Sequence, residues 1–153
     1  MTDPLDAIYN YRQVSPRLAT SGQPTEAGLA AIAAAGFEVV INLALHDDPR
    51  YSLADEPGTV RGLGMDYFHI PVQFAHPTQG DFTAFAAAMQ QNRHRQVWVH
   101  CAANMRVTAF LGLYRVLREN WQEQEAFRLM HDLWKPDEVW SAFIATMLAN
   151  RGS

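Results

Sequence analysis

The chain has 153 residues, of which 48% are hydrophobic and 18% are charged, a balance that predicts a globular domain with a substantial core. The formal net charge of −4, from 12 basic and 16 acidic residues, argues against a nucleic-acid-binding or membrane-surface role. One cysteine excludes an internal disulfide. The sequence shows neither a signal-peptide pattern nor an apolar run long enough to span a bilayer, so we expect a cytoplasmic protein.

Strand and helix signals alternate along the first part of the chain. Residues 18–20 form a short strand signal that turn-forming residues end. Thr25 is a suitable N-cap for an alanine-rich helix over 27–35, and Gly36 suits the C-terminal end of that helix. The β-branched run over 37–43 then predicts a buried strand.

The middle of the chain contains two more strand signals, separated by one helix. Residues 44–64 are rich in proline, glycine and aspartate, which predicts a long loop around at most one short helix. Residues 67–70 form the next strand signal. Thr78 and Asp81 lie three positions apart, a spacing that resembles a capping box, and apolar residues follow at helical spacing. A third core strand is predicted over 96–100.

The remaining sequence predicts helices over 105–118, 122–133 and 137–149. The first of these is apolar on most sides, as expected for a helix buried in the middle of a domain. We find no repeat, low-complexity tract or linker, so residues 1–153 are predicted to form a single domain. Alternating strands and helices predict an α/β layered fold, with a central sheet of four or five strands flanked by helices and a site at the carboxyl ends of the strands.

The junction that follows residue 100 places a cysteine and an arginine on either side of a short loop. A hydrophobic strand runs into His100 and Cys101, four small or modest residues follow, and Arg106 opens a helix. Loop amides, the positive potential of a helix N-terminus and a bidentate guanidinium can together hold an anion, and the same field favours the nucleophilic thiolate of Cys101. The residues expected to hold the anion are Ala102, Ala103, Asn104, Met105 and Arg106.

A lone cysteine at the end of a buried strand is most often an inert, small hydrophobic residue. In this sequence the cysteine is combined with His100, with an arginine at the start of the next helix and with a hydroxyl at Thr108. The combination favours a catalytic cysteine over a structural one.

These residues resemble the cysteine-dependent phosphatases of the protein-tyrosine and dual-specificity class. The chain looks most similar to a small bacterial branch of that superfamily, related to the N-terminal domain of β-lactamase-hydrolase-like proteins. The likeness extends over nearly the whole chain and is carried by residues 21–24, 36–43, 64–72 and 99–106. It implies a phosphatase-like layered fold without metal or cofactor. It also implies a phosphorylated protein or small molecule as the substrate, with a phosphate- or sulfate-type anion in the loop.

The resemblance implies roles for four residues. Cys101 would attack phosphorus and form a phosphocysteine intermediate, and Arg106 would bind the equatorial oxygens of the phosphoryl group. Thr108 would favour the thiolate as a leaving group, and His100 would tune the cysteine through hydrogen bonds rather than act as a base.

The loop departs from the family pattern in length and in composition. Four residues separate Cys101 from Arg106, where the family usually has five, and Asn104 stands where glycine is common. Because a shorter loop changes the curvature of the amide cradle, we expect weak or unusual activity.

The family's general acid is an aspartate in the loop after a strand such as 67–70, but residues 71–78 contain no carboxylate. Such an acid protonates the leaving oxygen, and losing it typically lowers the rate about 10²–10⁴-fold. The sequence leaves four candidates for this role: Asp48, Asp47, His76 and Asp81.

Three functions therefore remain open. The leading prediction is a phosphoester hydrolase that acts through a phosphocysteine. The missing acid and the short loop favour a pseudophosphatase, which would bind an anion or a phosphoprotein without turnover. A rhodanese-like sulfurtransferase is a further alternative, because those enzymes carry their cysteine on a shorter loop.

Overall fold

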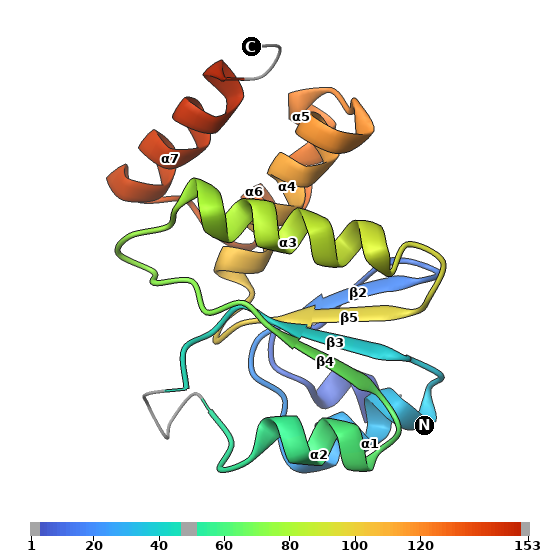
Figure 1. The fold of residues 1–153 in the computed structure, drawn as a ribbon. Helices are drawn as coiled ribbons and strands as arrows, with labels where there is room; N and C mark the ends of the chain where they lie inside the picture. The colour runs from blue at the N-terminus through green and yellow to red at the C-terminus, as the bar shows by residue number, and fades with distance from the viewer. Residues whose placement is uncertain (1–3, 47–51, 151–153) are drawn as a thin grey trace.

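The computed structural model describes residues 4–46 and 52–150, which form one five-stranded sheet with helices on both faces (Figure 1). The strands are β1 (Arg12–Ser15), β2 (Leu18–Ser21), β3 (Val39–Asn42), β4 (Asp66–His69) and β5 (Val97–His100). Their order in the sheet is β1-β2-β5-β3-β4. Neighbouring strands from β2 to β4 pair in parallel, whereas β1 pairs antiparallel with β2 at one edge. The sheet thus confirms the α/β prediction.

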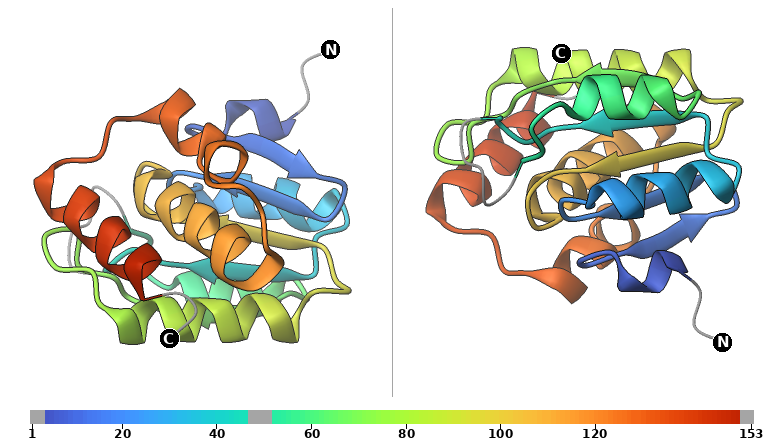
Figure 2. Two further views of the ribbon diagram at one scale, coloured as in Figure 1. Left: turned by 90° about the horizontal axis from the view of Figure 1, so that it is seen from above. Right: turned by 90° about the horizontal axis from the view of Figure 1, so that it is seen from below.

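Two groups of helices cover the two faces of the sheet (Figures 1 and 2). A 3-10 helix (Pro4–Ala7), α1 (Glu26–Ala34) and α2 (Glu56–Gly62) lie on one face. The other face carries α3 (Gln79–Gln91), α4 (Met105–Glu119), α5 (Glu123–Ala126), α6 (Arg128–Leu133) and α7 (Glu138–Ala149). Among the described helices, none combines the length and the hydrophobicity that crossing a bilayer requires.

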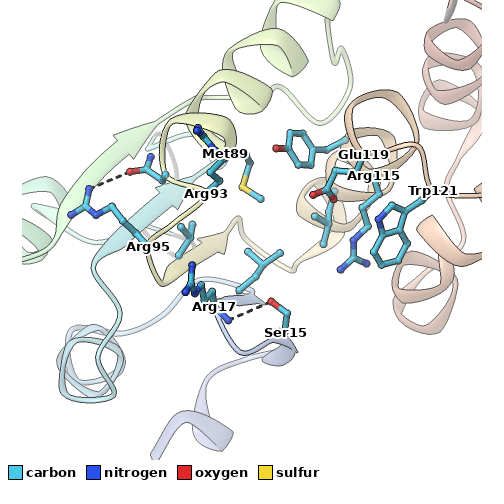
Figure 3. Close-up of a pocket in the computed structure, with 13 residues that line it drawn as sticks. Ser15, Arg17, Met89, Arg93, Arg95, Arg115, Glu119 and Trp121 are labelled. Carbon is cyan, nitrogen blue, oxygen red and sulfur yellow. Dashed lines mark hydrogen bonds between the residues drawn. The ribbon is translucent and has the colours of Figure 1, made fainter.

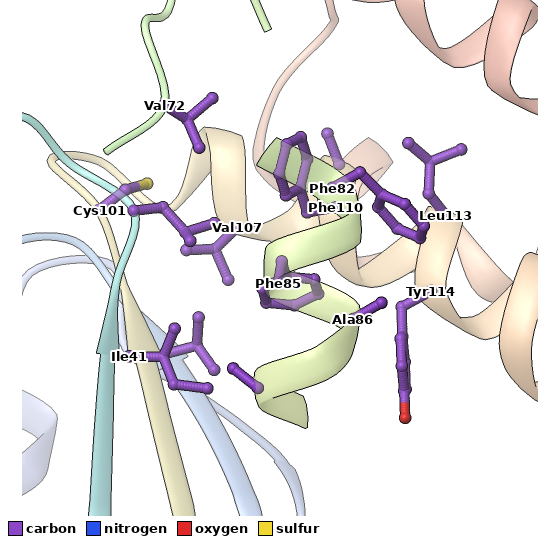
Figure 4. Close-up of a cluster of buried hydrophobic side chains, with 14 of the residues drawn as sticks. Ile41, Val72, Phe82, Phe85, Ala86, Cys101, Val107, Phe110, Leu113 and Tyr114 are labelled. Atoms are coloured by element: carbon purple, nitrogen blue, oxygen red, sulfur yellow. The ribbon is translucent and has the colours of Figure 1, made fainter. Parts of the chain in front are cut away.

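Each face of the sheet has its own hydrophobic core, because successive side chains of a strand point to opposite faces. Ile41 of β3 belongs to the same core cluster as aromatic residues of α3 and α4, including Phe85 and Phe110 (Figure 4). The neighbouring Val40 packs on the opposite face with Leu29 of α1. All residues of β3 and β5 are buried, which explains the unbroken apolar runs that identified these strands in the sequence.

The helix termini follow the signals read from the sequence. The Thr25 side chain accepts a hydrogen bond from the Gly28 amide at the start of α1. Thr78 and Asp81 form a complete capping box at the start of α3. Gly36 follows α1 with a φ of +98°, a conformation in which a side chain would be strained.

Two parts of the fold differ from the prediction. The 3-10 helix and β1 were not expected, because β1 is a short, mostly polar edge strand that pairs on one side only and so shows no apolar run. The single helix predicted over 122–133 is in fact α5 and α6, with Phe127 as the residue between them. The ring of Phe127 lies directly over Gly112 of α4, so α5 and α6 dock on α4 at this contact.

Replacing Gly112 with alanine is expected to destabilise the fold by about 1–3 kcal/mol, because overpacking a filled interface forces neighbouring groups to shift. A Cβ at this position would overlap the Phe127 ring. Urea unfolding should show this loss of stability. The matched control is Gly62→Ala in α2, because an added Cβ there meets no described atom within 4 Å. The control variant should be as stable as the wild type or slightly more stable. Equal stability of the two variants would contradict the tight docking of Phe127.

Candidate active site

Residues 101–106, which we call the cysteine loop, follow the carboxyl end of β5. This strand lies between β2 and β3 in the sheet. Asn104 is the N-cap of α4 and has a left-handed backbone, with φ 65°. Asparagine tolerates this conformation better than most residues, which explains how it can stand where glycine is common. Its amide nitrogen donates to the Asn10 carbonyl oxygen and to Thr20 Oγ1, each at 2.9 Å, so its side chain also anchors the loop.

The segment after β2 holds the loop from the outside. The backbone N–H of Gln23 donates to the Ala102 carbonyl oxygen at 3.0 Å, and the Asn10 side-chain amide donates to the Ala103 carbonyl oxygen at 3.1 Å. Gly22 passes so close that an added Cβ would lie 2.6 Å from the Ala102 oxygen. These contacts engage the carbonyl groups of the loop and leave its amides for another ligand.

Several backbone N–H groups of the loop and first helical turn make no hydrogen bond within the part of the chain that the structure describes. They include those of Ala102, Ala103, Met105, Arg106 and Val107. A helix N-terminus with unpaired amides favours negative charge. The loop has therefore both the donors and the potential that an anion requires.

Cys101 lies at the base of this loop, where its side chain is fully buried. It belongs to the same hydrophobic cluster as Val72, in the segment after β4, and Val107, in the first turn of α4. Figure 4 shows these two residues beside the cysteine. The sulfur is thus held away from the surface, at the point where the strand end, the loop and the helix meet.

Arg106 is the second residue of α4 and is only 8% exposed. Its Nη1 atom donates to the Val72 carbonyl oxygen at 2.8 Å, and its guanidinium carbon lies 5.9 Å from the centre of the Phe74 ring. The segment after β4 therefore lies beside Cys101 and also fixes the orientation of the Arg106 guanidinium.

His100 is fully buried and forms an ion pair that the sequence did not reveal. Its Nε2 atom lies 2.7 Å from Oε2 of Glu56, a carboxylate of α2 that is also fully buried. Its Nδ1 atom lies 3.3 Å from the Cys101 carbonyl oxygen. A carboxylate and a carbonyl oxygen are both acceptors, so the ring can donate to both only when it carries a proton on each nitrogen. In that state the pair places a positive charge next to the cysteine.

Two opposing effects act on the Glu56 carboxyl group. Burial alone would raise the pKa of Glu56, but the charge of His100 and hydrogen bonds from His100 and Gln23 outweigh it, so the pKa lies below its ordinary value. The Gln23 Nε2 atom donates to Glu56 Oε1 at 2.7 Å. The carboxylate is thus hydrogen-bonded through both oxygens.

The Thr108 hydroxyl is hydrogen-bonded to the preceding turn of the chain and to a tryptophan side chain. It donates to the backbone carbonyl of Asn104 or Met105, at 2.9 and 3.0 Å, and accepts a hydrogen bond from Trp134 Nε1 at 3.0 Å. This back-bonding is typical of a threonine inside a helix. In this structure the proton of Thr108 is therefore committed to the backbone of the loop, and not to the sulfur of Cys101.

The general-acid candidates lie in different environments. The Asp81 carboxylate accepts a hydrogen bond from the Thr78 amide at 3.1 Å, so it serves the capping box of α3. His76 is exposed in the loop between β4 and α3. Asp47 and Asp48 lie outside the described residues. Neither Asp81 nor His76 has a recorded contact with Cys101 or Arg106.

Further histidines line the carboxyl edge of the sheet beside this site. His46 stacks on His69 with ring centres 4.1 Å apart, and its Nε2 atom lies 2.9 Å from Asn42 Nδ2 and 3.1 Å from the Tyr67 hydroxyl. Burial and the neighbouring His69 lower the pKa of His46 below its ordinary value. Among the described residues, no group of three histidine, cysteine, aspartate or glutamate side chains is arranged to hold a metal ion.

Comparisons with known proteins agree with this arrangement. The family profile described as "DSP-PTPase phosphatase fused to NAD+ Kinase" matches residues 8–138. A DUF442 protein from Shewanella putrefaciens CN-32 is 33% identical, with a TM-score of 0.85, and the match covers 98% of each chain. Among curated proteins, no sequence matches significantly.

Two more distant structures share the fold. P. aeruginosa TpbA, solved as a cysteine-to-serine variant with phosphotyrosine, is 20% identical with a TM-score of 0.68, over 100% of this chain and 95% of that chain. The core catalytic domain of the S. cerevisiae PP-IP phosphatase SIW14, solved with citrate, is 14% identical with a TM-score of 0.70, over 90% of this chain and 85% of that chain. The resemblance drawn from the sequence is confirmed. This chain belongs to the DSP-PTPase phosphatase family, within the protein-tyrosine and dual-specificity phosphatase superfamily.

Proposed function

We propose that the protein hydrolyses phosphoesters through a phosphocysteine formed on Cys101. One observation carries the proposal: a cysteine lies at the base of a loop whose amides are unpaired, next to a helix N-terminus and an almost buried arginine. Unpaired donors that are fixed before substrate arrives stabilise charge that develops in a transition state. This arrangement suits a phosphoryl group better than a neutral ligand.

The reaction has two displacement steps. The Cys101 thiolate attacks phosphorus, the S–P bond forms, and the ester P–O bond breaks, so that the departing oxygen takes the electron pair and is then protonated by solvent. Water then attacks phosphorus and loses a proton, and the S–P bond breaks with its electron pair returning to sulfur. Arg106 and the loop amides hold the non-bridging oxygens in both steps, and the Glu56–His100 pair stabilises the thiolate.

Aryl phosphates are the substrate class that this site favours. Residues 71–78 contain no carboxylate, and Asp81 is engaged in the cap of α3, so an ester whose departing oxygen needs little protonation should react best. Phenolates leave more readily than aliphatic alkoxides. Phosphotyrosine, the ligand recorded for TpbA, is an aryl phosphate of this kind.

The direct test is hydrolysis of p-nitrophenyl phosphate by the purified chain. We expect turnover that vanadate inhibits and a radiolabelled phosphoenzyme after rapid quenching with acid. An aliphatic phosphate such as glycerol phosphate should react much more slowly. Absence of both turnover and phosphoenzyme in folded protein would refute the hydrolase.

Anion binding without turnover is the second candidate, favoured by the engaged state of Asp81 and by the complete burial of Cys101. It predicts saturable binding of inorganic phosphate that depends on Arg106, together with no release of p-nitrophenol. Sulfur transfer, in contrast, predicts a persulfide mass shift on Cys101 after incubation with thiosulfate.

A further inference from the structure

A second concave site lies at the end of the sheet opposite to Cys101. A cavity of about 260 Å³ opens between the turn after β1, the end of α3 and the C-terminal half of α4 (Figure 3). Leu18 and Val97 line it and are the first residues of β2 and β5, whereas the cysteine loop follows the last residue of β5. The two sites therefore lie at opposite ends of the same parallel strands.

The charge of this cavity is opposite in sign to that of the chain. The described side chains that line it carry four positive charges and one negative charge, which gives +3, whereas the whole chain has a net charge of −4. A concave surface with one sign of charge concentrates the potential and attracts ions of the other sign. The charged lining residues are Arg17, Arg93, Arg95, Arg115 and Glu119.

The arginines of the cavity differ in how they are engaged. Arg95 forms an ion pair with Asp66 at 2.8 Å and so is partly neutralised. The guanidinium groups of Arg17 and Arg115 have no hydrogen bond or ion pair with any residue in the described part of the chain. The guanidinium carbon of Arg115 instead lies 4.2 Å from the centre of the Trp121 ring. Burial lowers the pKa of Arg115 below its ordinary value, and the charge of the nearby Glu119 acts in the opposite direction. Two guanidinium groups without a hydrogen bond are thus available to an anion, and the one on Arg115 is partly desolvated and near a carboxylate.

The rest of the cavity wall is apolar or aromatic. Met89, Leu18 and Val97 line it together with the rings of Tyr114 and Trp121. Small-molecule sites commonly combine such an apolar wall with a few polar groups that fix the ligand's orientation. The volume of about 260 Å³ is close to the lower end of the range for small-molecule sites, about 300 Å³.

We propose that this cavity binds a small organic anion. Its phosphate, sulfate or carboxylate group would lie between Arg17 and Arg115, and its apolar or aromatic part would contact Met89 and Trp121. The proposal does not depend on hydrolysis at Cys101, because none of these side chains belongs to the cysteine loop.

Indole N–H signals in an NMR titration separate the two sites. We would add phenyl phosphate to ¹⁵N-labelled Cys101→Ser protein, in which a phosphocysteine cannot form. Trp121 reports on the cavity, and Trp134, whose Nε1 donates to Thr108, reports on the cysteine loop. We expect a saturable shift at Trp121, with phenyl phosphate binding more tightly than inorganic phosphate because the apolar wall contributes.

The Arg17→Gln variant decides the proposal, because Arg17 is exposed and its loss should not disturb the fold. Losing one charge-assisted contact should weaken binding at Trp121 about tenfold and leave the Trp134 curve unchanged. Arg61→Gln removes the same charge from α2, outside the cavity, and should change neither curve. A non-saturating shift at Trp121, or equal weakening by the two variants, would overturn the site. A saturable shift at Trp121 without a shift at Trp134 would support the cavity site and would contradict only the proposal that the cysteine loop binds phosphate.

Discussion

Replacing Arg106 with lysine is expected to lower kcat/KM for p-nitrophenyl phosphate by about 10²–10³-fold, the usual cost of losing a fixed donor to developing charge. Lysine keeps the positive charge but lacks the planar fork that binds two phosphoryl oxygens at once. Arg106 is held by the Val72 carbonyl at 2.8 Å, so its orientation is set before substrate binds. A lysine at this position would lose that orientation as well as the second donor.

Cys101→Ser should remove turnover entirely, because a serine hydroxyl at this position has no base to activate it and is a poor leaving group from phosphorus. The same variant should still bind phosphate, since the amides and Arg106 remain. The matched control for Arg106→Lys is Arg128→Lys, which makes the same change on the exposed surface of α6 and should retain full activity. If Arg106→Lys kept the wild-type kcat/KM, the guanidinium of Arg106 would not contact the reacting group.

The cysteine loop could be predicted from the sequence because all its residues are contiguous. Residues 100–106 carry the histidine, the cysteine and the arginine within one strand-to-helix junction, and the fold has only to bring β5 to the middle of the sheet. The departure at Asn104 also has a structural explanation. Its left-handed backbone is one that asparagine accepts, and its side chain holds the loop against Asn10 and Thr20.

Glu56 could not be predicted in the same way. It lies 44 residues before His100, within a segment that the sequence marks only as a loop around a short helix. An acidic residue in the first turn of a helix usually indicates a favourable interaction with the helix dipole at the surface. Only the packing of α2 against the sheet buries this carboxylate, so nothing in its spacing distinguishes it from an exposed one.

The general acid is undetermined for a similar reason. A long-range contact must bring a proton donor to the leaving oxygen, and the sequence offers four polar candidates in two loops and a helix turn without placing any of them at the site. In the structure the Asp81 carboxylate is part of the capping box of α3. The spacing of Asp81 from Thr78 in the sequence had already indicated this box.

Removing the Glu56 carboxylate is expected to have the largest effect on stability. Glu56→Ala leaves the buried His100 ring without its partner, and breaking a buried ion pair in this way typically costs about 3–5 kcal/mol. Both side chains are fully buried, so water cannot replace the lost contact without entering the core. Urea unfolding near neutral pH measures the loss directly.

Glu56→Gln separates charge from shape. The glutamine amide can accept from Gln23 through its oxygen and donate to His100 through its nitrogen, so a neutral imidazole that still donates to the Cys101 carbonyl satisfies every contact. We expect a smaller loss of stability than with alanine. We also expect slower alkylation of Cys101 by iodoacetamide near pH 6, because the positive charge beside the thiolate is lost. Equal alkylation rates in both proteins would show that the ion pair serves stability alone.

The pH dependence of stability provides an independent check on the charge of Glu56. Because its pKa is lower in the folded protein than its ordinary value of 4.5, the carboxylate contributes its full stabilisation above about pH 4.5. That contribution is lost as the pH falls through the folded-state pKa. The difference in unfolding free energy between wild type and Glu56→Gln should therefore be largest near neutral pH and shrink in acid. A difference that grows in acid would mean that Glu56 is buried as the neutral acid, and His100 would then have no anionic partner to hold its charge beside Cys101.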